Sequence, residues 1–102
     1  MKKPINQKEI LALLKRRART LKSMGATALY VFGSVARNEA TRTSDVDIFI
    51  DIDARRRFSL IDLVAMQNYL QDALHMKVDI TTRDGLHPML RRRIEHSAVR
   101  VF

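Results

Sequence analysis

The stretch from Asp45 to Asp53 constrains the fold more than any other part of this sequence. Aliphatic residues take every second position in it, and the positions between them are mostly acidic. The aliphatic set is Val46, Ile48, Ile50 and Ile52, and the other set is Asp45, Asp47, Phe49, Asp51 and Asp53. Because successive side chains of a β-strand point to opposite faces, this pattern predicts a strand with one face towards a hydrophobic core. At Asp51 and Asp53 we expect a solvated strand end, flanked by the arginines of residues 55–57.

Helical and strand patterns alternate along the rest of the chain. We expect helices over residues 7–23 and 87–97, and strands over residues 28–32, 45–53 and 77–81. A further helix is expected to start at Ser59, which forms a capping-box pattern with Asp62. Its expected core face is Leu60, Leu63, Val64, Met66, Leu70, Ala73 and Leu74, and the methionines Met24, Met66, Met76 and Met89 are expected to fill the core. This order predicts an α/β fold in which helices pack on a small mixed β-sheet, with residues 1–102 as a single domain.

The charge balance of the chain indicates an acidic partner. The 102 residues include 19 Lys and Arg against 11 Asp and Glu, for a formal net charge of +8. A nucleotide, a nucleic acid or an acidic protein surface would complement this charge. The arginine runs at residues 55–57 and 91–93 are interpreted as solvated faces, with an acidic partner or RNA as the alternative. Because the chain has no cysteine, disulfides, thiolate metal sites and a cysteine nucleophile are excluded.

The sequence predicts no membrane span. Its longest uncharged stretch, Ser23 to Ala36, is too short and too polar to cross a bilayer. We therefore expect a small cytoplasmic protein that does not insert into membranes.

Gly33 and Ser34 directly follow the predicted strand over residues 28–32. A glycine at this point permits a sharp turn and the close approach of a ligand. The free N–H groups of the short helical turn expected next suit a phosphate. The hydroxyl of Ser34 and the guanidinium of Arg37 can donate further hydrogen bonds to phosphate oxygens. Since a Gly-Ser turn alone usually has no function, this hypothesis depends on the residues that follow it.

Three aspartates supply the second half of the candidate site. Asp45 and Asp47 are two residues apart and face the same side of the predicted strand, so their mutual repulsion must be offset if both are ionised. Mg²⁺ would offset it, and this ion prefers one or two carboxylates together with substrate phosphate oxygens. Asp79 has the parity to face the same side from the next strand. It is therefore a third candidate metal ligand, or the base that takes the proton of an attacking hydroxyl.

This combination of residues resembles the signature of the DNA polymerase β-like nucleotidyltransferase superfamily. That signature is Gly-Ser, ten residues, then Asp-x-Asp. Here Gly33-Ser34 is followed by residues 35–44 and then by Asp45-Val46-Asp47, which matches in residue type and spacing. The resemblance covers roughly residues 8–102. It implies the polymerase β-like palm fold, in the form of a single minimal nucleotidyltransferase domain.

The resemblance also implies a role for each site residue. Gly33, Ser34 and Arg37 would bind a nucleoside triphosphate. Asp45, Asp47 and Asp79 would be the catalytic acids and the ligands of Mg²⁺. The implied reaction is attack of an acceptor hydroxyl on the α-phosphate, with release of pyrophosphate.

The tail from Leu86 to Val99 looks like the small bacterial branch of this superfamily, the MNT-type minimal nucleotidyltransferases. Many members of this branch are antitoxins, encoded beside a HEPN-family ribonuclease toxin, that transfer AMP from ATP to a tyrosine of that toxin. The resemblance therefore implies ATP as the donor and a hetero-oligomer with a cognate HEPN toxin. Asn38 stands where the branch usually has glycine, and we expect the turn to survive because Asn tolerates left-handed backbone.

Two alternatives to catalysis stay open at this point. A non-catalytic antitoxin would neutralise the toxin by complex formation alone, with its basic runs against an acidic surface. A domain that binds RNA or DNA would fit the net charge but not four acids within nine residues, and the chain offers few aromatic side chains for base stacking. The three-acid set favours the enzyme, because a pure binding protein does not require it.

Overall fold

The computed structural model describes residues 6–41 and 43–102. Residues 1–5 and 42, which the predicted domain includes, lie outside the described residues. The elements in chain order are helices α1 (Gln7–Arg16) and α2 (Ala18–Ser23), strand β1 (Ala26–Phe32), helix α3 (Gly33–Ala36), strand β2 (Val46–Ile52), helix α4 (Leu60–Leu74), strand β3 (Val78–Thr82), the 3₁₀ turn η1 (Arg83–Gly85), helix α5 (Arg91–Ser97) and strand β4 (Val99–Arg100).

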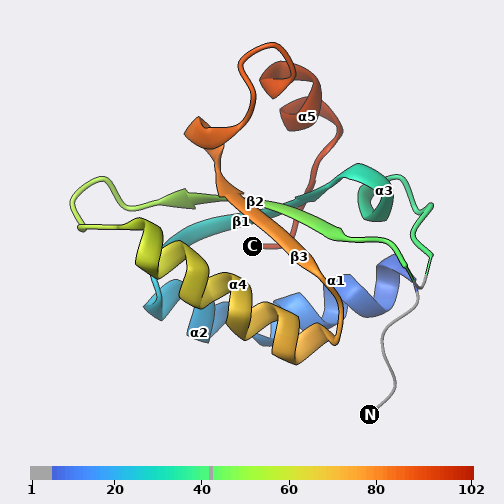
Figure 1. Ribbon diagram of the computed structural model, residues 1–102, viewed down its shortest axis with the longest axis horizontal. Coiled ribbons are helices and arrows are strands. Elements are labelled where there is room, and N and C mark those ends of the chain that lie inside the picture. Colours follow the sequence, from blue (N-terminus) through green and yellow to red (C-terminus); the bar gives the residue numbers. More distant parts are fainter. Residues whose placement is uncertain (1–5, 42) are drawn as a thin grey trace.

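The four strands form one mixed sheet in the order β3-β2-β1-β4. Strand β1 pairs antiparallel with both β2 and β4, whereas β2 and β3 are parallel. Helices α1, α2 and α4 lie on one side of the sheet, and α5 lies on the other (Figure 1). The prediction of an α/β fold with helices on a small mixed sheet is therefore confirmed.

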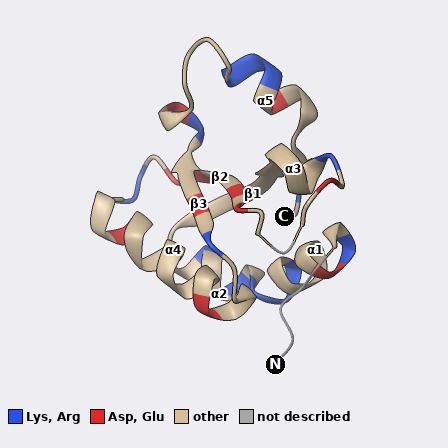
Figure 2. Ribbon diagram, turned by 45° about the vertical axis from the view of Figure 1, so that its right-hand side comes forward, with Lys and Arg blue, Asp and Glu red and all other residues tan. Residues whose placement is uncertain are grey.

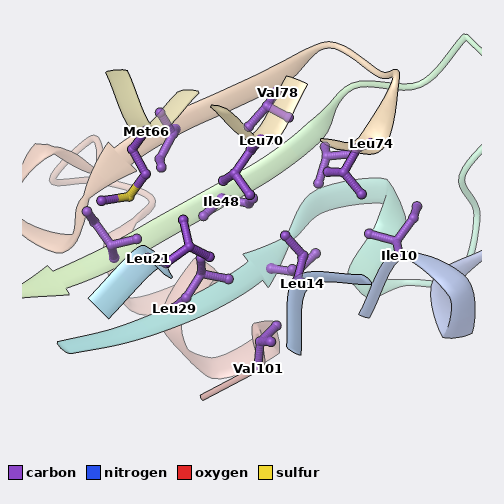
Figure 3. Packing of buried hydrophobic residues seen from close by; sticks show 14 of the residues in the cluster. Ile10, Leu14, Leu21, Leu29, Ile48, Met66, Leu70, Leu74, Val78 and Val101 are labelled. Atoms are coloured by element: carbon purple, nitrogen blue, oxygen red, sulfur yellow. The ribbon is translucent and has the colours of Figure 1, made fainter. Parts of the chain in front are cut away.

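The hydrophobic core fills the space between the sheet and helices α1, α2 and α4. The alternate positions Val46, Ile48 and Ile50 of β2 are all fully buried, as the period of the sequence predicts. They meet the helical residues Ile10, Leu14, Leu21, Met66, Leu70 and Leu74 (Figure 3). Since these contacts join β2 to three helices, the core fixes a strand that carries candidate site residues.

Local signals set the starts of the two longest helices. The Asn6 side chain accepts a hydrogen bond from the Glu9 amide at the start of α1, and Ser59 forms the predicted capping box with Asp62 at the start of α4. The single helix expected over residues 7–23 is divided at Arg17, whose amide bonds back to the Leu14 carbonyl in a tighter turn. Among the described residues, no helix is long and apolar enough to cross a membrane.

Three residues expected in the core are instead exposed. Leu60 and Val64 have 73% and 47% of their surface accessible, because the buried stripe of α4 runs through Leu63, Met66, Leu70 and Leu74 and leaves their side of the first turns in solvent. Met89 is 85% exposed. It lies in the turn before α5, which starts at Arg91 rather than at the expected residue 87, so no helical face carries it inward.

The second face of the sheet has its own covering, which the sequence did not predict. Phe49 is fully buried there and stacks against Tyr30, with 4.6 Å between ring centroids. The Arg83 guanidinium lies over both rings, at 4.9 and 5.0 Å. It also donates two hydrogen bonds to Asp51, of 2.7 and 2.9 Å, and one to Glu95. Asp51 is therefore a structural ion-pair partner, not the solvated strand end expected for it.

Candidate active site

Gly33 joins the end of β1 to the start of the short helix α3, close to the Asp47 carboxylate on β2. Its φ angle is +71°, a left-handed conformation that side chains with a Cβ rarely adopt. A Cβ at this position would overlap Oδ2 of Asp47 and lie 3.2 Å from its Cγ. The glycine is thus required twice, by the turn of the backbone and by the close approach of the carboxylate.

The turn after Gly33 holds Ser34 half-buried at the start of α3. The Ser34 carbonyl accepts a hydrogen bond of 2.8 Å from the Glu39 amide, which folds the following loop back onto the helix. Asn38 occupies this loop with a φ angle of +57°, so the left-handed turn expected with Asn in place of glycine does form. The Arg37 guanidinium is exposed and pairs with Glu39 at 3.0 Å.

Gln7, at the start of α1, supports α3 from a distant part of the sequence. Its side-chain amide donates hydrogen bonds of 3.0 Å to the carbonyls of both Val35 and Ala36. These carbonyls close the C-terminal end of a four-residue helix that has few bonds of its own. Sequence reasoning missed this contact, because an Asn-x-x-Glu cap gives no indication of what the neighbouring glutamine reaches.

The three aspartates lie at the starts of the neighbouring strands β2 and β3. Asp47 on β2 is the register partner of Asp79 on the parallel strand β3 and of Phe32 at the end of β1. Register partners on adjacent strands project to the same face, so the two carboxylates point to one side of the sheet. Figure 2 shows acidic positions on β2 and on β3. Asp45 precedes β2 by one residue and is exposed, with its Oδ2 at 4.0 Å from the Lys77 ammonium.

The surroundings of Asp47 perturb its ionisation. Burial raises its pKa above the ordinary value of 3.8, and the carboxylates of Asp79 and Asp45 raise it further, while Arg37 acts in the opposite direction. These influences show that both other acids, and the cation after the Gly-Ser turn, act on one carboxylate. A negative charge held there against burial and two like charges is well placed to receive a cation.

The donor set fits a hard divalent cation completed by other oxygen ligands. Among residues 6–41 and 43–102, no three His, Asp or Glu side chains converge closely enough to hold a metal ion by themselves. Carboxylates are nevertheless the protein ligands that Mg²⁺ uses, in ones and twos, together with phosphate oxygens and water. Metal binding by Asp45, Asp47 and Asp79 stays a prediction.

Chemically, the arrangement places a phosphate-type turn next to a group of carboxylates. Gly33, Ser34 and Arg37 come from one loop, and its glycine contacts Asp47 across the β1–β2 pair. Such a site can hold a polyphosphate at the turn with its reacting phosphorus towards the acids. Lys77, two residues before Asp79, adds a positive charge beside Asp45 that sequence reasoning also missed.

Comparison with known proteins places these residues in a described family. The family profile described as "Nucleotidyltransferase domain" matches residues 11–101. A relative from Methanocaldococcus jannaschii, named as a candidate protein adenylyltransferase, is 39% identical over 93 residues, which is 89% of this chain and 93% of the relative. The protein adenylyltransferase MntA of Thermococcus cleftensis is 30% identical over 94 residues, covering 91% and 93% of the two chains.

Solved structures show the same fold. A candidate minimal nucleotidyltransferase superposes with a TM-score of 0.69 at 35% identity, over 89% of this chain and 87% of the other. A toxin–antitoxin structure with AMP-PNP gives a TM-score of 0.72 at 20% identity, over 88% and 72%. A complex of a tri-AMPylated Shewanella oneidensis HEPN toxin with an MNT antitoxin gives 0.65 at 17% identity, over 90% and 71%. At these last two identities the likeness is one of fold.

Proposed function

Because this chain belongs to the nucleotidyltransferase domain family, with the polymerase β-like minimal fold, we propose that it transfers AMP from ATP to a protein hydroxyl in a Mg²⁺-dependent reaction. The acceptor we propose is a tyrosine of a cognate cytoplasmic HEPN ribonuclease toxin, which the modification inactivates. The names of its relatives support the enzyme class, since they are protein adenylyltransferases at 30% identity and above. A structural neighbour in which an MNT antitoxin is bound to an AMPylated HEPN toxin supports the kind of acceptor.

One observation carries the proposal, namely the contact between the Gly-Ser turn and the acids. Gly33 has no side chain where a Cβ would overlap Asp47, and Asp47 is aligned with Asp79 across the sheet. This arrangement supports a site in which a loop suited to phosphate lies beside Asp47 and its neighbour Asp79. If Gly33 served only to turn the chain after β1, the fold would not require a carboxyl group to pack against it.

In the proposed reaction, the acceptor oxygen attacks the α-phosphorus of ATP. A bond forms between that oxygen and phosphorus, the bond from the α-phosphorus to the bridging oxygen of the β-phosphate breaks, and pyrophosphate leaves with the electron pair. The α3 turn and the Ser34 hydroxyl hold the triphosphate. The Arg37 guanidinium stabilises the negative charge of the triphosphate after its ion pair with Glu39 has opened. Asp79, exposed at the edge strand of the sheet, is placed to accept the hydroxyl proton.

Asp45 and Asp47 would hold the metal ion together with phosphate oxygens. When bound, Mg²⁺ would supply the positive charge that offsets the repulsion among the carboxylates and the charge on the transferred phosphoryl group. The chain itself positions the reacting groups. Its strands fix the carboxylates and its glycine fixes how closely the triphosphate approaches them, as expected for a reaction in which the protein does little covalent chemistry.

A non-catalytic antitoxin is the second candidate function. The observation in its favour is the surface, which combines a net charge of +8 with exposed large apolar residues. Such a surface could neutralise an acidic toxin by binding alone. The two functions are compatible within one protein, so the experiment has to separate them.

Labelled ATP separates the two candidates. The purified chain is incubated with Mg²⁺, ATP labelled on the α-phosphate and the HEPN-family protein encoded beside it. We expect label on the HEPN protein with the wild-type chain and none with Asp45→Ala/Asp47→Ala. The control Asp53→Ala/Asp72→Ala removes the same number of negative charges at positions away from the site. With this control variant, the HEPN protein should still be labelled. Toxin that is neutralised without label, equally by all three proteins, would identify the non-catalytic function instead.

A further inference from the structure

The turn before α5 presents two large apolar side chains to solvent. Met89 is 85% exposed and Leu90 is 46% exposed. The turn is nevertheless well ordered by hydrogen bonds to His87, whose carbonyl accepts from the amides of Leu90 and Arg91, both at 2.9 Å, and whose Nδ1 accepts from the Met89 amide at 3.1 Å. Exposure of large apolar residues on a fixed turn costs solubility, so it indicates a contact surface.

Ion pairs stand on both sides of this turn, and one of them reaches the second face of the sheet. Before it, Arg83 bonds to Asp51 on β2 and to Glu95 on α5. After it, Arg91 pairs with Asp84 at 3.3 Å and with Glu95 at 3.5 Å. A surface held in this way loses little conformational freedom when a partner binds, which favours affinity.

The turn belongs to the side of the sheet that carries the acids. Arg83 lies over Phe49, and Phe49 is two residues from Asp47 on β2, so their side chains share one face. The other exposed apolar group, formed by Leu60, Ile61 and Val64, is on α4, which covers the opposite face (Figure 1). A protein that presents a hydroxyl to Asp47 has to dock on the first of these sides.

The charges beside the turn define what it would bind. Arg92 and Arg93 are exposed at the start of α5 and directly follow the apolar pair and Arg91 in the sequence. Figure 2 shows this basic stretch at the start of α5. Within the part of the chain that the structure describes, no carboxylate forms an ion pair with either guanidinium. A partner surface complementary to this one has an apolar patch surrounded by carboxylates, and a protein can provide such a surface. RNA fits less well, because Met and Leu side chains offer neither charge to phosphates nor an aromatic ring to bases.

We propose that Met89, Leu90, Arg92 and Arg93 form the docking surface for the protein acceptor, which contributes an acid-rimmed apolar patch. This inference rests on the proposed function and adds the partner contact to it. The apolar pair anchors the complex, since a few desolvated side chains carry most of the free energy of an interface. The arginines accelerate and orient association through charge complementarity.

Two matched pairs of substitutions test the docking surface. Met89→Ser/Leu90→Ser removes the apolar pair, and Leu60→Ser/Ile61→Ser removes another exposed apolar pair, on the opposite side. The probe is the HEPN-family protein encoded beside this chain, and its Kd is measured by calorimetry without nucleotide. We expect the first pair to raise Kd by about tenfold or more and the second pair to leave it unchanged. Met89→Ser alone, at the more exposed position, guards against an effect of folding.

Kinetics add a readout that a purely structural role would not give. The KM for the HEPN acceptor should rise in Met89→Ser/Leu90→Ser, while kcat at saturation and the Kd for ATP stay at wild-type values. Arg92→Glu/Arg93→Glu should slow association, and more so at low salt.

Several other outcomes would overturn the docking surface. Equal Kd values for both apolar pairs, a larger effect of the α4 pair, or no binding by the wild-type chain would contradict it. Self-association lost in Met89→Ser/Leu90→Ser would identify a second copy of the chain as the occupant, and RNA binding lost in Arg92→Glu/Arg93→Glu, with HEPN binding intact, would identify RNA. If the wild-type chain binds through Met89 but transfers no AMP, the proposed function fails and the docking surface stands.

Discussion

Replacing Gly33 by alanine tests how the turn and the acids depend on each other. Two costs follow from the structure. The φ angle of +71° is left-handed, which costs a residue with a Cβ about 1–2 kcal/mol. The new Cβ would also overlap Asp47 Oδ2 and stand 3.2 Å from its Cγ, so the carboxylate has to rotate away, at about 1 kcal/mol for a strained rotamer. We expect Gly33→Ala to lower the free energy of unfolding by about 2–3 kcal/mol.

A double-mutant cycle with Asp47→Ala separates these two costs. In the Asp47→Ala background the overlapping atoms are gone, and the remaining Cβ at 3.5 Å is an ordinary contact. Only the backbone strain is left, so Gly33→Ala should cost about 1 kcal/mol less there than in the wild type, which exceeds the usual error of additivity. Nucleotide transfer by Gly33→Ala itself should fall steeply, because the displaced Asp47 carboxylate no longer faces Asp79.

Urea unfolding followed by circular dichroism measures all four corners of the cycle, with the m-value checked for constancy. Gly25→Ala is the matched control. Its φ angle of +122° also imposes strain, but the nearest atoms belong to the Phe58 ring and not to Asp47. Its cost should be the same in both backgrounds. If Gly33→Ala lowers the free energy of unfolding by the same amount with and without the Asp47 carboxylate, the contact with Asp47 is not the reason for a glycine at position 33.

Three further predictions concern single features of the structure. Asp45→Ala/Asp47→Ala should melt no lower than the wild type in metal-free buffer, because the raised pKa of Asp47 means that its charge is disfavoured in the fold; a large drop in Tm would contradict this. The Arg83 hydrogen bonds hold the pKa of Asp51 below 3.8, so its contribution to stability is complete above that pH and is lost as the pH falls through the lowered pKa; Asp51→Asn should remove this part of an acid titration, and an unchanged profile would refute it. Gln7→Ala removes one hydrogen bond from each of two α3 carbonyls, of which the Val35 carbonyl keeps the Asn38 amide as a donor, so we expect a loss of about 1 kcal/mol in urea unfolding and a several-fold higher KM for ATP; an unchanged KM would remove the support role of Gln7.

Periodic patterns in the sequence predicted those helices and strands that depend on local sequence alone. The alternation from Val46 to Ile52 gave β2 and its buried face correctly, and the Ser59 cap gave the start of α4. Strand β4 could not be predicted, because it is two residues long and exists only through pairing with Tyr30 and Val31. The exposure of Leu60 likewise depends on where α4 crosses the sheet. The helical period of the sequence carries no information about that position.

For the site, spacing predicted the residues but not their contacts. The Gly-Ser and Asp-x-Asp segments were identified together, yet the reason for Gly33 is a carboxylate fourteen positions later. The Arg83 ion pair with Asp51 joins β2 to the turn after β3, and the Gln7 amide joins α1 to α3. Such long-range polar contacts leave no period in a sequence, because any residue with the right donor could make them.

Intact and tandem mass spectrometry of the HEPN protein tests the central claim most directly. The HEPN protein is analysed after incubation with this chain, Mg²⁺ and each of the four nucleoside triphosphates in turn. We predict a mass increase of one or more AMP groups with ATP, located on a tyrosine, absent with Asp45→Ala/Asp47→Ala and absent when chelator replaces Mg²⁺. An unmodified HEPN protein in a stable complex with the wild-type chain, with every nucleotide, would contradict the claim that this site transfers nucleotides to its partner.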